Sequence, residues 1–342
     1  MDSRGAKTRR QGRKAWGCVL VMLTALAGHD GRAEEFRLSL PLDCIPGVSC
    51  FIQNYVDVAP GPQVLDYRCG GQSYDGHKGT DFRLLSTRQA QEMKVAVRAA
   101  ASGVVKALRD GMADRLVTKT GNVPTGRECG NGVVIDHGEG RETQYCHLLN
   151  GSVAVRVGQS ISRGERLGSV GYSGWAQFAH LHFALRIAGR VIDPFSGRSP
   201  DGRCDAPAAS SYWRDVVAAR LGYRDGELLQ AGFASGALKA MDLETGSTAM
   251  RPPAHGAAAI VLYARFINLR KGDRISLSLS GAEGPVAKAL SPPLESNKAH
   301  YVYYAGKKRG GRGWPAGLYH GEVRLVRADR VVLSRQLVHR IR

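Results

Sequence analysis

Three short segments of this chain carry residue types that together could hold a metal ion. They are His77-Lys78-Gly79-Thr80-Asp81, an isolated His147 and the pair His180-Leu181-His182. Residues i and i+2 of a strand point to the same face, so His180 and His182 can both project into one groove. A zinc ion in a hydrolase usually has three protein ligands and leaves a fourth position for water. His77, Asp81 and His182 would fill that set, which leaves two other imidazoles, His147 and His180, to move protons.

Each motif alone is weak evidence for a metal site, but the three motifs together are stronger evidence. A single His-x-His in a strand is more often a half-buried surface pair than a ligand set. Gly76 and Gly79 favour a loop that enters a strand around His77, and not a helix. Each segment is flanked by apolar or β-prone residues such as Phe82 and Tyr145, which would fix the side chains. We therefore interpret the five residues as one site.

In order and spacing these motifs resemble those of the lysostaphin/LytM-type zinc metalloendopeptidases, which carry His-x-x-x-Asp, a lone His in a strand and His-x-His. The similarity covers about residues 65–196, and it extends to the segments 74–82, 101–105, 130–138, 157–159, 164–168 and 179–183. By this resemblance His77, Asp81 and His182 would hold one zinc ion per chain, while His147 and His180 would be the catalytic pair. Residues 173–179 form a longer loop than the family's usual Ser-x-Gly-Pro, which bears on substrate preference.

The resemblance implies an exported zinc metalloendopeptidase that hydrolyses stem-peptide cross-links or bridges of bacterial peptidoglycan through a zinc-activated water. We expect His180 to act as the general base and His147 to stabilise the oxyanion, although these roles can be exchanged. The alternatives are a catalytically silent LytM-like protein that binds peptidoglycan or activates another hydrolase, and a secreted protease acting on other proteins. Asn54 is a candidate for zinc's fourth position in a latent form, and we expect His137 to be structural.

Residues 1–33 are interpreted as a signal peptide, because a basic start leads into an apolar run at residues 15–27 that is too short to span a bilayer. We therefore expect a periplasmic or secreted protein, with an uncleaved N-terminal membrane anchor as the alternative. This segment contains seven Lys/Arg and two Asp/Glu, a net charge of +5. Its removal lowers the formal net charge of the protein from +18 to +13. Such a protein attracts anionic polymers such as a carboxylate-rich cell wall, and export argues against nucleic acid as a partner.

Six cysteines follow the signal peptide without any Cys-x-x-Cys spacing, which predicts disulfides in an exported chain. Our hypothesis is a set of three pairs, with other connectivities left open: Cys44–Cys50, Cys129–Cys146 and Cys69–Cys204. The second pair would stiffen the strand that carries His147.

Short strands separated by glycines must position the site. β-prone runs occur at residues 104–108, 133–136, 143–148, 153–157, 167–170, 180–187 and 191–192. They predict an all-β fold, with an antiparallel lysostaphin-type β-sheet catalytic domain. A lead-in strand is expected near residues 51–56. One helix is predicted over residues 86–93, where Ser86 and Gln89 have capping-box spacing.

We predict five parts along the chain: signal peptide (1–33), lead-in segment (34–64), zinc metallopeptidase domain (65–200), connector (201–225) and β-sandwich accessory domain (226–342). The connector should contain a short helix over residues 211–221, capped by Ser210. In the last part Ile275, Leu277 and Leu279 alternate with serines, which predicts a smaller immunoglobulin-like β-sandwich. Residues 314–319 are expected to enter an edge or corner strand.

The accessory domain has no His/Asp/Glu cluster of its own, so we expect a packing or docking module. Cell-wall binding is the alternative, through the basic residues Lys307, Lys308, Arg309 and Arg312.

Overall fold

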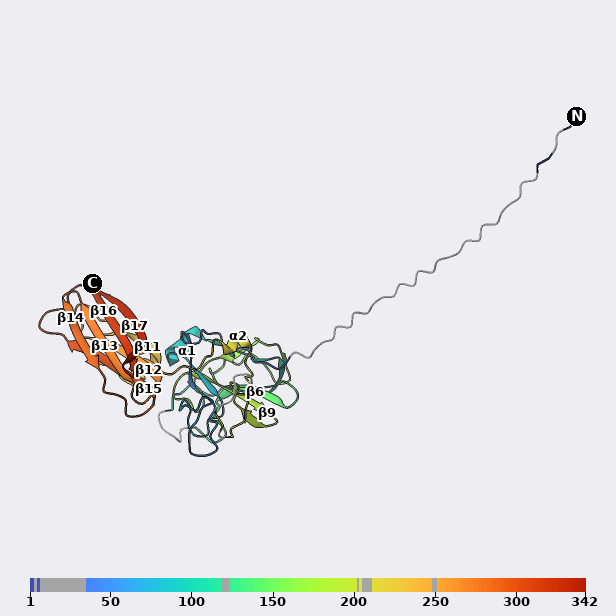
Figure 1. The fold of residues 1–342 in the computed structure, drawn as a ribbon, viewed down its shortest axis with the longest axis horizontal. Helices are drawn as coiled ribbons and strands as arrows, with labels where there is room; N and C mark the ends of the chain where they lie inside the picture. The colour runs from blue at the N-terminus through green and yellow to red at the C-terminus, as the bar shows by residue number, and fades with distance from the viewer. Residues whose placement is uncertain (3–4, 7–34, 118–122, 202, 205–210, 248–250) are drawn as a thin grey trace. The chain divides into compact units, whose positions relative to one another are not determined.

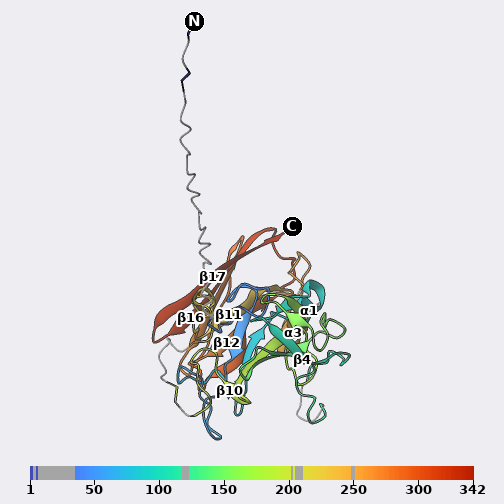
Figure 2. The same cartoon turned by 90° about the vertical axis from the view of Figure 1, so that its right-hand side faces the viewer.

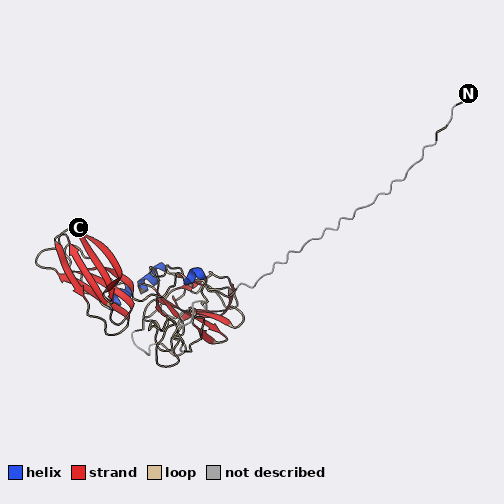
Figure 3. Ribbon diagram, viewed as in Figure 1, coloured by secondary structure: helices blue, strands red, loops and turns tan. Residues whose placement is uncertain are grey.

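Strands dominate the part of the chain that the structure describes (Figures 1 and 3). The structure is a computed structural model, and it describes residues 1–2, 5–6, 35–117, 123–201, 203–204, 211–247 and 251–342. The predicted signal peptide therefore lies almost entirely outside the described residues, as does Ser210. None of the described helices is both long and apolar enough to span a membrane. The strand pairs are antiparallel, which confirms the all-β prediction.

The first half of the fold is built on one large sheet. Its strand order is β1-β2-β9-β6-β5-β4-β7, and β10 also pairs with β9. The strands are β1 (Phe51–Asn54), β2 (Thr80–Arg83), β4 (Gly103–Arg109), β5 (Asn131–Asp136), β6 (Arg141–Leu148), β7 (Ser160–Ile161), β9 (His180–Ile187) and β10 (Arg190–Ile192). Two further strands, β3 (Ala96–Arg98) and β8 (Arg166–Ser169), pair with each other. The predicted site residues thus fall on or beside three adjacent strands, β2, β9 and β6.

Alternation along β2 and β9 separates a core face from a polar face. Phe82, Leu181 and Phe183 are fully buried in one hydrophobic core. Trp213 is also fully buried there, and its ring lies 5.5 Å from the ring of Phe183. Side chains of a strand point alternately to the two faces, so the residues between these positions point away from that core. His180 and His182 are such residues.

Among the described residues, three short helices lie outside the sheets: α1 (Thr87–Met93), α2 (Asp215–Ala218) and α3 (Ala240–Thr245). The prediction for α1 is confirmed, since the Ser86 hydroxyl accepts a hydrogen bond from Gln89 N. The helix predicted over residues 211–221 is wrong for most of its length. The backbone of residues 212–214 instead forms hydrogen bonds with the backbone of Leu38. These bonds keep the segment extended, and the side chain of Trp213 lies in the core. α3 was not predicted.

The second half is a β-sandwich (Figure 2), in which the described residues form seven strands. One sheet has the order β11-β12-β15 and the other β14-β13-β16-β17. The strands are β11 (Glu227–Ala234), β12 (Ala259–Leu269), β13 (Arg274–Gly281), β14 (Gly284–Leu290), β15 (Lys298–Lys308), β16 (Gly317–Arg327) and β17 (Arg330–Ile341). The fourth strand pairs with the third, whereas an immunoglobulin constant domain pairs its fourth strand with the fifth.

The alternation predicted for the sandwich is confirmed, because Ile275, Leu277 and Leu279 are all buried. Two strand predictions are wrong. Residues 153–157 are described but form no strand. Ala154 N donates a hydrogen bond to the carbonyl oxygen of Leu167. Residues 314–319 lead into β16, which is an internal strand paired on both sides.

Three charged side chains join the sandwich to the first sheet. Arg83 on β2 donates to Glu244 Oε2 at 2.6 Å, and Arg265 on β12 donates to the same oxygen. Arg83 and Arg265 are 2% and 1% exposed, and Glu244 on α3 is also buried. Charged residues are rarely this buried unless they are paired. The strand that carries Asp81 is therefore fixed to the sandwich through a buried ion triad.

Candidate metal centre

Three of the predicted site residues meet at one point on the polar face of the sheet. Asp81 and His182 are opposite each other in the β2–β9 register, and their Oδ1 and Nδ1 atoms are 2.9 Å apart. His77 comes from the loop before β2. Its Nε2 atom lies 3.1 Å from Asp81 Oδ1 and 3.1 Å from His182 Nδ1. The predicted set His77, Asp81 and His182 is thus brought together.

The donor atoms have the spacing that a small metal ion requires. Tetrahedral zinc with nitrogen and oxygen ligands at about 2.0–2.1 Å places the ligand atoms about 3.3 Å apart. The three observed separations are 2.9–3.1 Å, and two of the donors are imidazole nitrogens facing a carboxylate. This donor set fits zinc in both chemistry and spacing.

Hydrogen bonds on the outer side orient two of the donors. His77 Nδ1 lies 2.7 Å from the carbonyl oxygen of Tyr55, which can only accept, so the proton is on Nδ1 and the Nε2 lone pair faces the centre. Asn54 Nδ2 donates to Asp81 Oδ2 at 2.8 Å. Partners of this kind hold metal ligands in place. Asn54, expected as a candidate fourth ligand, instead supports the carboxylate.

Gly79 makes room for the ring of His182. A Cβ atom at this position would lie 2.7 Å from His182 Nε2 and 2.6 Å from the carbonyl oxygen of Phe183. Cβ atoms in proteins essentially never lie within 3.0 Å of another heavy atom that is not a neighbour in the chain. The glycine is therefore required for the position of the imidazole, a role that its sequence context alone does not reveal.

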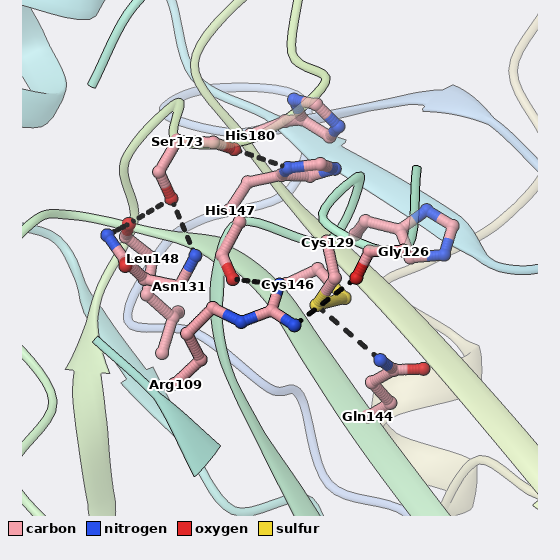
Figure 4. The surroundings of a disulfide bond; sticks show 12 residues. Arg109, Gly126, Cys129, Asn131, Gln144, Cys146, His147, Leu148, Ser173 and His180 are labelled. Atoms are coloured by element: carbon pink, nitrogen blue, oxygen red, sulfur yellow. Dashed lines mark hydrogen bonds between the residues drawn. A yellow bond between two sulfur atoms is a disulfide. The ribbon is translucent and has the colours of Figure 1, made fainter. Parts of the chain in front are cut away.

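His147 and His180 lie beside the donor set and face each other, with ring centroids 4.4 Å apart. His147 Nδ1 lies 2.8 Å from the carbonyl oxygen of Ser173 (Figure 4). His180 Nδ1 lies 2.9 Å from the carbonyl oxygen of Phe178. Each imidazole therefore carries its proton on Nδ1 and has a free lone pair on Nε2. His180 Nε2 is 3.7 Å from Asp81 Oδ1.

Burial favours the neutral form of both imidazoles. It lowers the pKa of His180, and it lowers the pKa of His147 well below its usual value, where a positive charge on His180 or His182 acts in the same direction. The donor set behaves in the opposite way. Burial would lower the pKa of His77, but the adjacent Asp81 carboxylate outweighs it and the net shift is upward. Burial would raise the pKa of Asp81, yet the surrounding histidines hold it well below its usual value.

His147 has an unusual backbone, with φ at +62° in the left-handed region that non-glycine residues seldom adopt. Cys146, its neighbour in the chain, forms a disulfide with Cys129, and His147 N donates to the carbonyl oxygen of Cys129 at 2.8 Å (Figure 4). These bonds hold the backbone in a conformation it would otherwise leave. The predicted connection between this disulfide and His147 is present.

All three predicted disulfide pairs are confirmed: Cys44–Cys50, Cys69–Cys204 and Cys129–Cys146. His137 is in a structural position, with its two ring nitrogens 2.7 Å from Ser102 O and 2.7 Å from Thr143 Oγ1.

Arg83 is a residue near the site that sequence reasoning missed. Its guanidinium lies 4.3 Å from the ring centroid of Phe178, whose carbonyl oxygen orients His180. It also pairs with Glu244. Arg83 is the last residue of the short strand β2, and the sequence gives no signal of its pairing with Glu244, because Glu244 lies far away along the chain.

The profile of peptidase family M23 matches residues 75–194, which include all five site residues. The chain contains a peptidase family M23 domain. Within the M23 domain, the His-x-x-x-Asp and His-x-His motifs supply the three clustered donors.

Two relatives are similar to part of this chain. The peptidoglycan DD-endopeptidase ShyA of Vibrio cholerae is 38% identical over 87 residues, which are 25% of this chain and 19% of the relative. The DD-carboxypeptidase/endopeptidase Mpg of Neisseria meningitidis is 35% identical over 97 residues, 27% of this chain and 22% of the relative. The chain thus matches only about a fifth of the length of either protein.

Among solved structures, a zinc-containing peptidase from Vibrio cholerae matches with a TM-score of 0.29 and 22% identity, covering 46% of this chain and 37% of that one.

Proposed function

We propose that this protein is an exported zinc endopeptidase that hydrolyses peptide bonds in the stem-peptide cross-links or bridges of bacterial peptidoglycan. The observation that carries the proposal is the cluster of three donor atoms, 2.9–3.1 Å apart, beside two buried imidazoles. The family of the domain and the names of the two relatives support a peptidase, and the name of the peptidoglycan DD-endopeptidase ShyA supports the substrate.

In this proposal His77, Asp81 and His182 hold zinc, with one ion per chain. When bound, zinc lowers the pKa of a coordinated water to about 7 and polarises a carbonyl as a Lewis acid. The side chains of the site would bind and orient the peptide and move its protons. The buried position of Asp81 and His77 keeps competing solvent away from the donors.

His180 is our choice for the general base. Its Nε2 lone pair is free, and the nearby Asp81 carboxylate favours the protonated form that the base must reach. His147 would donate to the developing oxyanion once Nε2 carries a proton. The two rings are equally well oriented by backbone carbonyls, so exchanged roles are the alternative assignment. Acid–base help of this kind is worth about 10²–10⁴ in rate.

Export to the periplasm or the exterior is part of the proposal. The N-terminal segment has the pattern of a signal peptide. Three disulfides are typical of a protein in an oxidising compartment. A mature net charge near +13 would favour a polymer rich in carboxylates over nucleic acid.

The test compares release of soluble fragments from purified peptidoglycan by the wild-type protein and by His77→Ala. The matched control is His320→Ala, which changes an exposed histidine on β16. We expect the wild type and the control to release fragments at equal rates and His77→Ala to lose at least about 100-fold in rate. Mass spectrometry of the fragments then identifies the bond that is cut.

Equal release by His77→Ala and the wild type would contradict the proposal. Binding of peptidoglycan without release by any of the proteins would instead indicate a catalytically silent protein that binds the wall or activates another hydrolase. Cleavage of glycine-rich peptides but not of peptidoglycan would indicate a secreted protease with another substrate.

A further inference from the structure

A polar cavity lies where the chain segment before His77 approaches the sandwich. Its volume is about 420 Å³, within the usual range for ligand sites. Residues 68–72 line one side, and residues 268–271 and 297–299 line the other. None of the five residues of the metal centre lines this cavity.

The floor of the cavity is ordered by hydrogen bonds. Gln72 and Asn268 are both buried, and Asn268 Nδ2 donates to Gln72 Oε1 at 3.0 Å. Gln72 Nε2 donates in turn to Asp225 Oδ1 at 3.0 Å. Because both side chains are held by several partners, the floor is preorganised and does not have to rearrange around a ligand.

The rim of the cavity is positively charged. Among its charged residues, Arg270 is paired with Asp225. Arg68, Lys271 and Lys298 also line the cavity, and in the described part of the chain their side chains form no ion pair. Three uncompensated cations around a polar floor favour an anionic ligand that also has groups for hydrogen bonding.

Hydrogen bonds through the backbone of Tyr55 connect the cavity to His77 of the metal centre. The carbonyl oxygen of Gln72 accepts from Tyr55 N at 2.8 Å. The carbonyl oxygen of Tyr55 accepts from His77 Nδ1 at 2.7 Å and from the hydroxyl of Ser73 at 2.7 Å. A long ligand that occupies the cavity would therefore be bound by the same short segment that positions His77.

We propose that this cavity is a second binding site that takes a carboxylate-bearing part of the peptidoglycan chain whose scissile bond lies at the metal centre. The inference rests on the proposed function. Peptide stems offer carboxylates for Lys271 and Lys298 and amides for the polar floor. The sandwich would then contribute to substrate binding through the end of β12 and the start of β15, and not through Lys307 and Lys308.

The test measures binding of an uncross-linked peptidoglycan fragment, a disaccharide that carries its stem peptide, to the full-length protein. The cavity variant is Lys271→Gln/Lys298→Gln. The matched control is Lys307→Gln/Lys308→Gln, which removes the same charge from exposed positions on β15. At about 0.15 M salt we expect the cavity variant to bind roughly 3- to 30-fold more weakly than the wild type. The control should differ from the wild type by less than about twofold.

Equal weakening in both variants would overturn the proposal, because it would show general attraction to a basic protein. No measurable binding to the wild type would also overturn it. Displacement of the fragment by inorganic phosphate at equal concentration would show a general anion site and overturn the assignment to carboxylates.

Hydrolysis of whole peptidoglycan, measured in parallel with the wild type and His77→Ala, separates the two proposals. Hydrolysis without any effect of the cavity variant on fragment binding would reject the cavity alone. Cavity-dependent binding without hydrolysis would reject the proposed activity alone.

Discussion

Glu244→Gln should destabilise the protein more than any other single carboxylate-to-amide change at an ion pair described above. The substitution keeps the shape of the side chain and one oxygen acceptor, but it removes the negative charge that Arg83 and Arg265 share. Both guanidinium groups are at least 98% buried, so solvent cannot replace the lost charge. The variant would leave two like charges together in the protein interior.

The geometry sets the size of the effect. Two nitrogens that both donate to one oxygen lie no more than about 6 Å apart. At an effective dielectric constant of about 20, two unit charges at this distance repel by about 3 kcal/mol. Measured losses on removing one partner of a buried ion pair are about 3–5 kcal/mol. In the wild type burial lowers the pKa of Arg83 to about 10 against the opposing effect of Glu244. A guanidinium keeps its proton at neutral pH in proteins, so both charges remain in the variant.

Thermal unfolding at pH 7, followed by circular dichroism, measures this effect. We expect the midpoint to fall by about 5–8 °C for a loss of 3–5 kcal/mol in a chain of this size. The matched control is Glu92→Gln, which breaks the exposed ion pair with Arg88. An exposed pair of this kind is worth at most about 0.5 kcal/mol, so the control should unfold within about 1–2 °C of the wild type.

A midpoint for Glu244→Gln that equals that of Glu92→Gln would refute this reasoning. A rescue experiment separates buried charge from lost packing. Replacing Arg83, Glu244 and Arg265 together with apolar residues of similar volume should recover most of the stability, because no uncompensated charge remains. Failure of this triple variant to regain stability would show that packing, and not charge, is the main contribution.

Two further predictions concern the same region and the metal centre. Burial beside the charge of Arg265 lowers the pKa of His300 to about 3, so the unfolded chain binds more protons between this value and about 6.5. The free energy of unfolding should therefore decrease as the pH is lowered through this window. Measured by urea unfolding, this decrease between pH 6.5 and 4.5 should be about 2 kcal/mol smaller for His300→Gln than for the wild type. Gly79→Ala should weaken zinc binding by roughly 10- to 100-fold by displacing the ring of His182. The control Gly61→Ala, where an added Cβ meets nothing within 4 Å, should bind zinc as the wild type does in competition with a chelator.

Much of the candidate site could be predicted because its side chains occur in short motifs with fixed spacing. The spacing of His180 and His182 follows directly from the two-residue repeat of a strand, and the structure brings both to the face where Asp81 lies. The disulfide next to His147 could be predicted for a similar reason, since its cysteines flank a hairpin.

The groups that orient the imidazoles could not be predicted in this way. Three of them are backbone carbonyl oxygens, of Tyr55, Ser173 and Phe178. A carbonyl group has the same chemistry at every position, so only the fold decides which one accepts a hydrogen bond. The ion triad is likewise hidden, because Glu244, which accepts from both Arg83 and Arg265, lies more than a hundred residues from Arg83 in the chain.

The errors in the fold prediction have related causes. The sequence of residues 212–214 is compatible with a helix. Burial of Trp213 in the core stabilises the fold more than an exposed helical turn would, so the backbone forms hydrogen bonds with Leu38 instead. Strand β14 was missed because its half-exposed residues show little alternation. The boundaries predicted at residues 65–200 and 226–342 stay predictions, while the M23 match itself spans residues 75–194.

Zinc content of the wild type and of five single alanine variants tests the central claim most directly. The protein would be dialysed against micromolar zinc and then against metal-free buffer, and the metal counted per chain. The account predicts one zinc per chain in the wild type, in His147→Ala and in His180→Ala. It predicts at most a small fraction of this in His77→Ala, Asp81→Ala and His182→Ala, although all five should remain folded by circular dichroism. Zinc retained in full by the last three, or absent from the wild type, would contradict it.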